Sequence, residues 1–369
     1  MTKIIMDCDL MKHKNSGLYY YCLNLGLHVK KILDQESSAA ISFYGDPIDL
    51  EAFNNPCRPI NQRSWLTDKR KLGLEPVKWY QKFYRKPTNE HIVWHAPFQS
   101  GRVLPRPNKF VKILLTIHDL NPLHENIFTD EQRAASLSHT QSLIDKSDAL
   151  VCISEFSKQD VLRHLDVKHK PIHVIHNGSN PLGIPPVMTV GYQPSRPFLF
   201  TLGYVNRKKN FKVLIPLLKS QPNLELVIAG KIDEPDYLHD IEALAISLGV
   251  RDRVHVAGQI SDADKAWYLK NCLAFMFPSL AEGFGLPVTE AMTFGKPLFL
   301  SNRTSLPEIG GDVAFYFADF DPVYMNTLFT ESMIKYEKDN MAEKIIQRGT
   351  DFCWEKSAKK YIEVYKTLR

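Results

Sequence analysis

The sequence predicts an α/β protein built from two doubly wound parallel sheets in tandem. Short apolar runs bounded by polar or turn residues recur along the chain, as expected for strands buried on both faces. Stretches with helical spacing lie between them, and this alternation is typical of parallel sheets covered by helices. A proline-rich segment separates two series of runs, and 369 residues exceed what one hydrophobic core usually fills. Two Rossmann-like domains facing a central cleft are therefore expected.

The expected strands fall into two series. The first series is KIIMD, AAISFYG, HIVWHAP, KILLTIHD, ALVCIS and IHVIHNG, and the second is PFLFTLGY, LELVIAG, RVHVAG, AFMFPS and PLFLS. Helical spacing is found at residues 18–33, 129–146, 157–164, 211–218 and 237–248. These patterns predict a first domain at 1–182, a linker at 183–197 and a second domain at 198–352.

The composition is that of a folded protein rather than a disordered one, with 44% hydrophobic and 24% charged residues. The first apolar run is too short for a signal peptide, and no segment approaches the length that spans a membrane. Six cysteines are scattered without CxxC pairs, which favours reduced thiols. We therefore expect a cytoplasmic protein.

Positive charge gathers in one segment, although the net charge of +5 is modest. Residues 63–86, RSWLTDKRKLGLEPVKWYQKFYRK, combine many cations with aromatic rings. Such a segment can lie at an anionic membrane surface, and the protein would then be peripheral on the inner face of the cytoplasmic membrane. It can equally be a solvated helix whose rings pack at i,i+4 spacing. Both interpretations stay open.

The segment PSLAEGFGLPVTEAMTFGKP, residues 278–297, carries the most chemical information. It follows the apolar run AFMF, so we expect a strand, a loop and then a helix. Gly283 and Gly285 let the backbone approach a ligand closely, and Pro287 suits the first turn of a helix. The amides of residues 284–288 are then expected to point at a phosphate group, which binds at such a helix start after a parallel strand.

Glu282 and Glu290 flank this expected phosphate position, and carboxylates accept hydrogen bonds from sugar hydroxyl groups. This E-x7-E arrangement, with its FGLP, EAM and GKP surroundings, resembles the signature of retaining GT-B glycosyltransferases of family four, which includes many bacterial mannosyl- and glucosyltransferases. The resemblance implies that Glu282 faces the donor sugar and that Glu290 binds the ribose. The loop residues implied in donor binding are Gly283, Phe284, Gly285 and Leu286.

TLGYVNRKKNFKVL resembles the family's strand-end glycine followed by Arg-Lys-Asn, where cations hold the donor diphosphate. Gly203 matches the glycine, and Lys209 and Asn210 match the Lys-Asn pair. The family's arginine falls at Lys208, with Arg207 beside it. Either residue could supply the second cation, although lysine acts as a point charge where arginine offers two parallel hydrogen bonds.

Two segments of the first domain also resemble the family. KILLTIHDL ends in His118 and Asp119, and the resemblance implies that this histidine contacts the donor sugar. Asp119 could orient the imidazole or cap the next turn, and both roles stay open. KNSGLYYYCLNL resembles the glycine loop before the first helix, so Gly17 is expected to bring an amide to the diphosphate. The family often has two glycines where this chain has Ser16 and Gly17.

Other matches support the same resemblance. LVIAGK and VHVAGQIS resemble strands whose ends bound the nucleotide-base pocket, which implies Gly230, Lys231 and Gly258 as further donor contacts. FCWEKSAKKYIEVY resembles a closing helix that crosses back to the first domain. We therefore expect residues 353–369 to pack toward that domain, with Trp354 as a packing residue.

The resemblance implies hexose transfer with retention of configuration, helped by the leaving diphosphate as it takes the acceptor proton. Glu282, His118 and Lys209 are the expected catalytic residues. The expected donor is GDP-mannose, and the expected acceptor is a glycan or lipid-linked glycan in surface polysaccharide synthesis, such as lipopolysaccharide O-antigen. No metal ion, other cofactor or nucleic-acid partner is expected.

Other functions are weighed against this one. A nicotinamide-dependent dehydrogenase should carry G-x-G-x-x-G after an early strand, and the sequence has no such match. An epimerase or phosphorylase of the same fold would differ in forming product without an acceptor, and a non-catalytic sugar-binding protein would differ in lacking turnover. Within the transferases, glucose, rhamnose and N-acetylglucosamine stay open as the transferred sugar.

Overall fold

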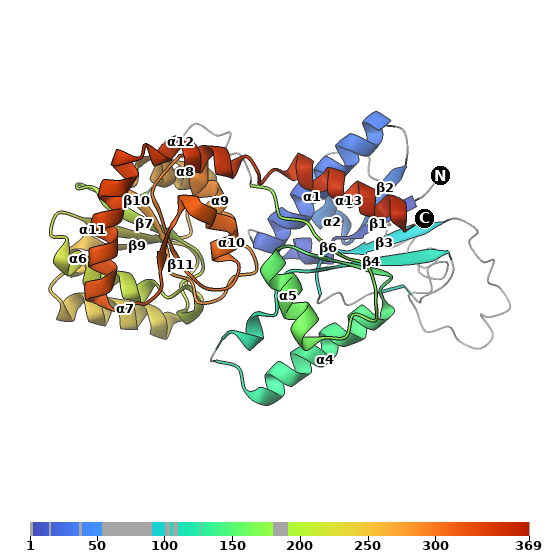
Figure 1. Cartoon of the computed structure of the whole chain (residues 1–369), viewed down its shortest axis with the longest axis horizontal. Helices are drawn as coiled ribbons and strands as arrows, with labels where there is room; N and C mark the ends of the chain where they lie inside the picture. Colours follow the sequence, from blue (N-terminus) through green and yellow to red (C-terminus); the bar gives the residue numbers. More distant parts are fainter. Residues whose placement is uncertain are drawn as a thin grey trace. The chain divides into compact units, whose positions relative to one another are not determined.

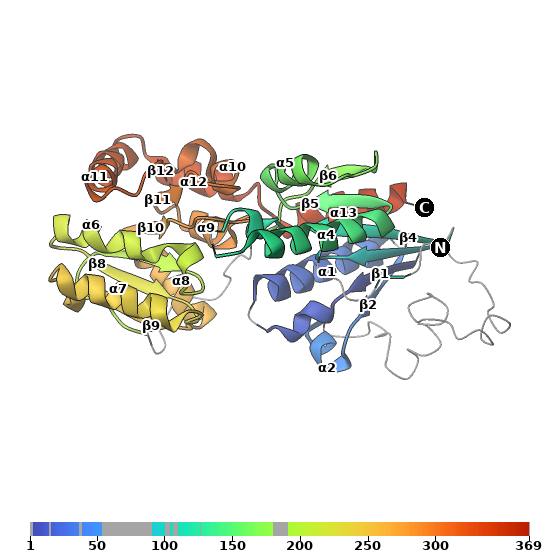
Figure 2. The same ribbon diagram turned by 90° about the horizontal axis from the view of Figure 1, so that it is seen from below.

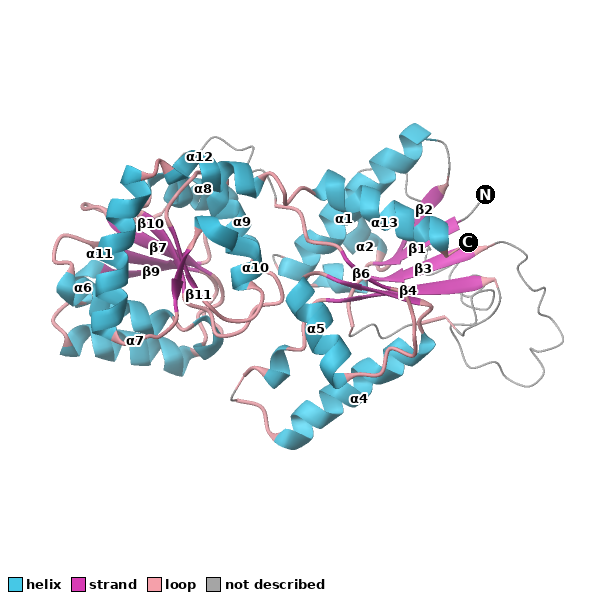
Figure 3. Cartoon of the chain, in the orientation of Figure 1, coloured by secondary structure: helices cyan, strands magenta, loops and turns pink. Residues whose placement is uncertain are grey.

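The computed structural model describes residues 3–14, 16–36, 39–53, 91–99, 104–105, 110–125, 127–179 and 191–368. The chain divides into two compact units: unit 1 comprises Met1–Gly178 and Cys353–Arg369, and unit 2 comprises Ser179–Phe352. In each unit the strands form one parallel sheet with helices on both faces (Figure 3). The basic segment 63–86 and residues 183–190 of the expected linker lie outside the described residues.

The sheet of unit 1 has the strand order β2-β1-β3-β4-β5-β6, and every neighbouring pair is parallel. Its register places Ile4 opposite both Ile41 and Val93. The strands are β1 (Lys3–Asp7), β2 (Ala40–Tyr44), β3 (Ile92–Ala96), β4 (Val111–Ile117), β5 (Ala149–Cys152) and β6 (Ile172–Val174).

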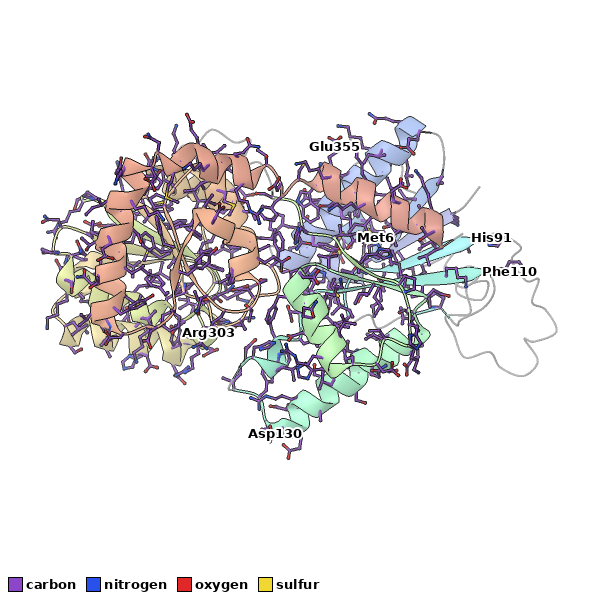
Figure 4. All side chains as sticks on the ribbon, viewed as in Figure 1. Met6, His91, Phe110, Asp130, Arg303 and Glu355 are labelled. Carbon is purple, nitrogen blue, oxygen red and sulfur yellow. The ribbon has the colours of Figure 1, made fainter. Side chains whose placement is uncertain are left out.

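Alternate side chains of these strands fill two apolar layers, because successive residues of a strand point to opposite faces. Ile5, Trp94 and Leu115 belong to a buried cluster that also contains residues of α4 and α5. Met6, on the neighbouring position of β1, is fully buried inside unit 1 (Figure 4). The helices and helical turns are η1 (Asp9–Lys12), α1 (Gly17–Glu36), α2 (Pro47–Leu50), η2 (Glu51–Phe53), η4 (Asn121–Leu123), α4 (Asp130–Lys146), α5 (Glu155–His164) and α13 (Trp354–Thr367).

Helix α13 comes from the far end of the sequence and packs along α1 (Figures 1 and 2). Its polar anchors are buried: the Tyr361 hydroxyl lies 2.6 Å from the Tyr21 hydroxyl and 3.1 Å from Thr116 Oγ1. The Tyr365 hydroxyl lies 2.8 Å from His95 Nδ1. The outer face of the same helix carries Glu355 in its first turn (Figure 4). The expected return of the C-terminal helix to the first domain is therefore confirmed, and Trp354, which is 2% exposed, is a packing residue.

The sheet of unit 2 has the strand order β12-β11-β10-β7-β8-β9. Chain order therefore runs outward in one direction from β7 and in the other from β10, so a topological switch point lies between these two neighbours. The strands are β7 (Phe198–Leu202), β8 (Glu225–Ala229), β9 (Val254–Gly258), β10 (Ala274–Phe277), β11 (Leu298–Ser301) and β12 (Phe315–Phe317).

The helices of unit 2 include two long ones, α7 and α11, and several of one or two turns. They are η5 (Arg207–Lys209), η6 (Phe211–Leu214), α6 (Ile215–Ser220), α7 (Pro235–Ser247), η7 (Arg251–Arg253), α8 (Asp262–Asn271), α9 (Leu286–Met292), α10 (Leu306–Gly310), η8 (Gly311–Val313), α11 (Pro322–Lys338) and α12 (Met341–Gly349). Among the helices that the structure describes, none has both the length and the apolar character needed to cross a bilayer.

Each apolar run that the sequence analysis assigns to a strand overlaps one of these strands, so the prediction of two doubly wound parallel sheets is confirmed. One expected helix differs in detail. Residues 211–218 form a 3-10 turn, Phe211–Leu214, before the α-helix begins at Ile215. Pro216 stands in the first turn of that helix, where its missing N–H costs nothing, and this explains why the α-helix starts late.

Candidate active site

The candidate site lies at the carboxyl ends of β7 and β10, on either side of the switch point of unit 2. The loop after β7 carries Lys209, and the loop after β10 carries Glu282. Because β7 and β10 are hydrogen-bonded neighbours, these two loops meet although they lie far apart in the sequence. The Lys209 ammonium forms an ion pair with Glu282 Oε1, and both side chains are almost buried, with 11% and 12% exposed.

Lys209 is held by its own short helical turn. Asn206 caps this turn, because its Oδ1 accepts the Lys209 N–H at 3.2 Å. Asn210 ends the turn in a left-handed conformation with φ of 55°, which asparagine tolerates better than most residues. The side chain then extends under Gly203 and places its Nζ 4.9 Å from the centre of the Phe277 ring. A Cβ at Gly203 would stand 3.0 Å from Lys209 Cε, so the glycine leaves room for the cation.

Glu282 is fixed at its carboxylate and at its backbone. Its Oε1 accepts a hydrogen bond of 2.6 Å from the Ser279 hydroxyl in addition to the ion pair with Lys209. Its backbone N–H donates to Thr304 Oγ1 at 2.9 Å, and its carbonyl accepts from the Ser305 hydroxyl at 2.9 Å. Burial alone would raise the pKa of Glu282, but the charges of Lys209 and Lys208 and the hydrogen bonds hold that pKa below its ordinary value. The site therefore keeps an ionised carboxylate beside cations.

Three of the expected donor-binding glycines stand at the carboxyl edges of adjacent strands, and two of them serve backbone packing. The Gly230 N–H donates to the Gly258 carbonyl at 2.7 Å, and the Gly203 N–H donates to the Ala229 carbonyl at 2.9 Å. A Cβ at Gly230 would stand only 1.9 Å from the Gly203 carbonyl oxygen. A Cβ at Gly258 would meet no heavy atom within 4 Å. Gly230 is thus required by the fold itself, whereas Gly258 faces open space.

Lys231 follows Gly230, and its side chain is exposed. The Lys231 carbonyl accepts the Val205 N–H at 2.9 Å, which joins the loops after β7 and β8. The backbone of Lys231 is thus part of the structure around the site, and its ammonium stands on the surface of unit 2.

The glycine loop and α9 follow Glu282 as expected, with one correction. Gly285 has φ of 103°, which favours glycine, and Leu286 begins the helix. Phe284 is 3% exposed and packs edge-on against Phe352. The Val288 N–H donates to the Gly285 carbonyl at 2.9 Å, so the expectation that this amide points at a phosphate is wrong. The helix is also short, since it ends at Met292.

Glu290 lies inside α9 and is 7% exposed. Burial raises its pKa, and this effect is partly offset by the Lys265 ammonium, which lies 2.9 Å from Glu290 Oε1. Lys265 belongs to α8 and also pairs with Asp262 at 3.2 Å. The second glutamate is therefore a buried carboxylate with its own cation, and Lys265 is a neighbour that the sequence analysis missed.

The structure separates the two candidates for the second diphosphate cation. The Arg207 guanidinium donates to Glu234 at 2.8 Å and to Asp240 at 3.0 Å, so it turns toward α7. Arg207 and Asn210 line a pocket of about 430 Å³ together with Tyr237, Leu280 and Phe320, among others. Lys208 is half-buried, and its charge acts on Glu282. The Lys208 carbonyl accepts the Leu280 N–H at 2.8 Å, so the backbone of Lys208 joins the loop that carries Glu282, whereas the Arg207 side chain turns toward α7.

The candidates of unit 1 also stand after strands. His118 is buried and its Nε2 lies 2.8 Å from the Pro97 carbonyl, which can only accept, so Nε2 carries the proton and Nδ1 carries the lone pair. Burial lowers the pKa of His118 to about 4, so the ring is neutral at physiological pH. Asp119 Oδ1 accepts the N–H of Asn121, the first residue of η4, at 3.1 Å. Gly17 is exposed and is the first residue of α1.

Four residues near the glutamates were missed from the sequence. Ser279, Thr304 and Ser305 hold Glu282, and Lys265 holds Glu290. Thr304 and Ser305 begin the segment TSLPEIGGDVAFYF, which lies beyond the glutamate helix and ends with β12. A hydroxyl group that bonds the backbone of a distant loop leaves no local pattern in the sequence. Of these residues, only Ser279 could have been predicted from the sequence, because it lies three residues before Glu282.

The sequence matches the models of two known protein families. Residues 191–352 match the family model described as "Glycosyl transferases group 1", and residues 42–181 match the one described as "Glycosyltransferase Family 4". Between them, the two matches take in most of the chain. The chain belongs to the group 1/family 4 glycosyltransferases.

Several curated glycosyltransferases are similar to this one. The O-antigen chain mannosyltransferase B of Escherichia coli is 25% identical over 286 residues, which cover 71% of this chain and 72% of that protein. The serotype-specific mannosyltransferase WbdA of E. coli is 28% identical over 289 residues. That match covers 72% of this chain but only 34% of WbdA, so the chain spans about a third of that relative.

Solved structures show the same fold at lower identity. The sucrose-phosphate synthase of Thermosynechococcus elongatus has a TM-score of 0.71 and 18% identity, and the match covers 100% of this glycosyltransferase and 99% of that chain. HepE of Anabaena, solved in complex with UDP-glucose, has a TM-score of 0.66 and 14% identity, and 99% of each chain is covered. These likenesses, together with the two parallel sheets, confirm the predicted GT-B fold.

Proposed function

We propose that this glycosyltransferase moves mannose from GDP-mannose, with retention of configuration, onto a glycan or lipid-linked glycan acceptor. The observation that carries the proposal is the nearly buried ion pair of Lys209 and Glu282 at the switch point of unit 2, where a cation suited to a diphosphate stands beside a carboxylate suited to sugar hydroxyls. The named activities of the E. coli relatives support mannose as the sugar and surface polysaccharide as the setting. Association with a membrane stays a prediction of the sequence.

In the proposed reaction, the bond between the anomeric carbon and the diphosphate oxygen breaks. A bond from the same carbon to the acceptor oxygen forms on the same face, and the acceptor proton passes to the leaving diphosphate. Negative charge grows on the diphosphate, so fixed cations beside it lower the barrier. The Lys209 ammonium has three N–H donors and one bonds Glu282, which leaves donors for phosphate oxygens. Lys208 adds a second charge.

Glu282 has a different role in this proposal. Its Oε1 holds Lys209 and Ser279, and its Oε2 can accept a hydrogen bond from a hydroxyl group of the donor sugar. Because the pKa of Glu282 lies below its ordinary value, the carboxylate stays charged as positive charge develops on the sugar ring. A contact between His118 and the sugar stays a prediction, as does the ribose contact of Glu290.

The donor can be identified by thermal unfolding in the presence of GDP, UDP, ADP and dTDP and their sugar conjugates. A ligand at 100 times its dissociation constant stabilises the folded state by about 2.7 kcal/mol, or roughly 5–10 °C for a domain of this size. We expect GDP and GDP-mannose to give this shift and GDP-mannose to be turned over. We also propose that no divalent ion is needed, so turnover in EDTA should equal turnover in Mg²⁺ within about twofold. The absence of a shift with any nucleotide would reject the proposed function.

A pair of substitutions tests the assignment of the second cation. Lys208→Met should weaken binding of GDP about 10- to 100-fold, which is the value of one charged hydrogen bond. Arg207→Met should change it less than about threefold, because Arg207 is committed to Glu234 and Asp240 on the surface of the unit. Titration calorimetry measures both. If Arg207→Met weakens binding and Lys208→Met does not, the assignment is wrong.

A further inference from the structure

We propose that Thr304 is a positioning residue that fixes the place of Glu282 in the candidate site. The proposal rests on the proposed function, since it concerns the same carboxylate. Thr304 lies on the loop between β11 and α10, immediately after Arg303 (Figure 4). No motif in the sequence marks it, and two independent observations point to it.

The first observation is the backbone conformation of Thr304. Its φ is 52°, in the left-handed region that β-branched residues strongly avoid. In the described parts of the chain, the other non-glycine residues with positive φ are Lys168, His169, Asn210 and Asn340. None of these is β-branched, and asparagine is the side chain that adopts this region most readily. A threonine here is therefore costly, and a glycine would relieve the cost.

The second observation is that the Thr304 and Ser305 hydroxyl groups bond the backbone of Glu282. Thr304 Oγ1 accepts the backbone N–H of Glu282 at 2.9 Å. The next residue, Ser305, is fully buried and donates its hydroxyl to the Glu282 carbonyl at 2.9 Å and to the Phe284 carbonyl at 3.1 Å. Two consecutive hydroxyl groups thus bind the N–H and the carbonyl of the same glutamate. Both hydroxyl groups reach the loop after β10 from this left-handed turn.

The loop that carries these hydroxyls is anchored on its other side. The Arg303 guanidinium lies over the Phe320 ring, 5.7 Å from its centre, and the Asn302 N–H donates to the Phe317 carbonyl at 3.2 Å. Thr304 therefore projects from a fixed segment onto Glu282. Residues with strained backbone cluster at functional sites, where the strained conformation places a reacting group although it lowers stability.

Four variants distinguish an effect on the position of Glu282 from an effect on the stability of the protein. Thr304→Gly removes both the strain and the hydroxyl. Thr304→Ala removes the hydroxyl and keeps part of the strain, and Thr304→Ser keeps the hydroxyl with the same part of the strain, since neither alanine nor serine is β-branched. Asn340→Gly is the matched control, because Asn340 is also left-handed, with φ of 47°, and lies at the start of α12, outside the loops after β7, β10 and β11. For each, the melting temperature, kcat, KM for GDP-mannose and the dissociation constant of GDP are measured.

We expect Thr304→Gly to melt at or above the wild-type temperature while its kcat falls at least about 10-fold, because a small misplacement of a reacting group is costly. Its GDP affinity should change less than about threefold, since GDP does not depend on the sugar contact. Thr304→Ala should show the same loss of kcat, Thr304→Ser should restore kcat to within about threefold, and Asn340→Gly should have wild-type kcat.

Equal kcat values for Thr304→Ala and Thr304→Ser would overturn the proposal, and this comparison stands even if Thr304→Gly fails to fold. A fall in kcat that accompanies an equal loss of GDP affinity would also overturn it, because a general disturbance of the loop would then explain both. If the wild-type protein transfers sugar and all Thr304 variants do so equally, the positioning role alone is wrong. If the wild-type protein binds no nucleotide, the proposed function fails and the role of Thr304 fails with it.

Discussion

Replacing Glu282 by glutamine is expected to lower the rate of sugar transfer by about 10²- to 10³-fold, the usual cost of removing one fixed electrostatic partner of a transition state. Glutamine keeps the size of the side chain and can still bond Ser279, but it carries no charge. If Glu282 has the proposed role, the reaction then loses the carboxylate that stabilises positive charge on the sugar ring. GDP binding should stay the same or become tighter, because Lys209 no longer shares its charge with Glu282.

The matched control for this experiment is Glu225→Gln. Glu225 is 3% exposed in the same unit, and it begins β8, at the opposite end of the strands from the candidate site. It accepts hydrogen bonds from Tyr192 at 3.0 Å and from Ser195 at 2.9 Å, so the substitution also neutralises a buried, bonded carboxylate. Kinetics and calorimetry are compared for the two variants. A similar loss of kcat in both, or a Glu282→Gln protein with wild-type turnover, would remove Glu282 from the reaction.

Replacing Gly230 by alanine is expected to cause the largest loss of stability among the substitutions considered. The new Cβ would stand 1.9 Å from the Gly203 carbonyl oxygen, and φ of 139° is itself unfavourable for alanine. Overpacking and backbone strain together should lower the free energy of unfolding of unit 2 by about 4 kcal/mol, which lowers its melting temperature by roughly 8–15 °C. The displaced loop at Gly203 leads to Lys209, so weaker GDP binding should accompany the loss.

Gly249→Ala is the control for the backbone strain alone. Gly249 has φ of 70°, and a Cβ there would meet no heavy atom within 4 Å. This substitution should lower the free energy of unfolding by about 1 kcal/mol and the melting temperature by roughly 2–4 °C. Differential scanning calorimetry of the two variants measures the difference. If both melt at the same temperature, the contact between Gly230 and Gly203 does not govern the stability of unit 2.

The strands and most long helices could be predicted because their signals are local. Apolar runs mark buried parallel strands, and helical spacing marks the segments that cover them. Glu282 and Lys209 could also be named one by one from short motifs. Their pairing could not be predicted in the same way, because it depends on β7 and β10 being neighbours in the sheet. Strand order is a property of the whole fold, which an alternating pattern leaves open.

Other features of the site depend on tertiary packing alone. Lys265 lies in the polar sequence DADKAWYLK, which by itself indicates a solvated helix face, but only 14% of its side chain is exposed because α8 packs beside α9. Gly230 was expected at the nucleotide-base pocket, but its backbone contact with Gly203 becomes visible only when two strand ends are brought together. The direction of the Arg207 side chain depends likewise on Glu234, which caps α7, and on Asp240 within that helix, and both stand well beyond the motif.

The place of α13 in unit 1 has a consequence for how the protein is made on the ribosome. Residues 3–178 emerge first, but Tyr361 and Tyr365, which bond Tyr21, Thr116 and His95, are translated only after the whole of residues 179–352. At ~5–20 residues per second this delay is roughly ten seconds or more. All six described strands of the unit 1 sheet are translated by then, so during that time the nascent chain exposes the face of this sheet that α13 later covers beside α1. Unit 2, although it is translated later, is the first whose described residues are all available.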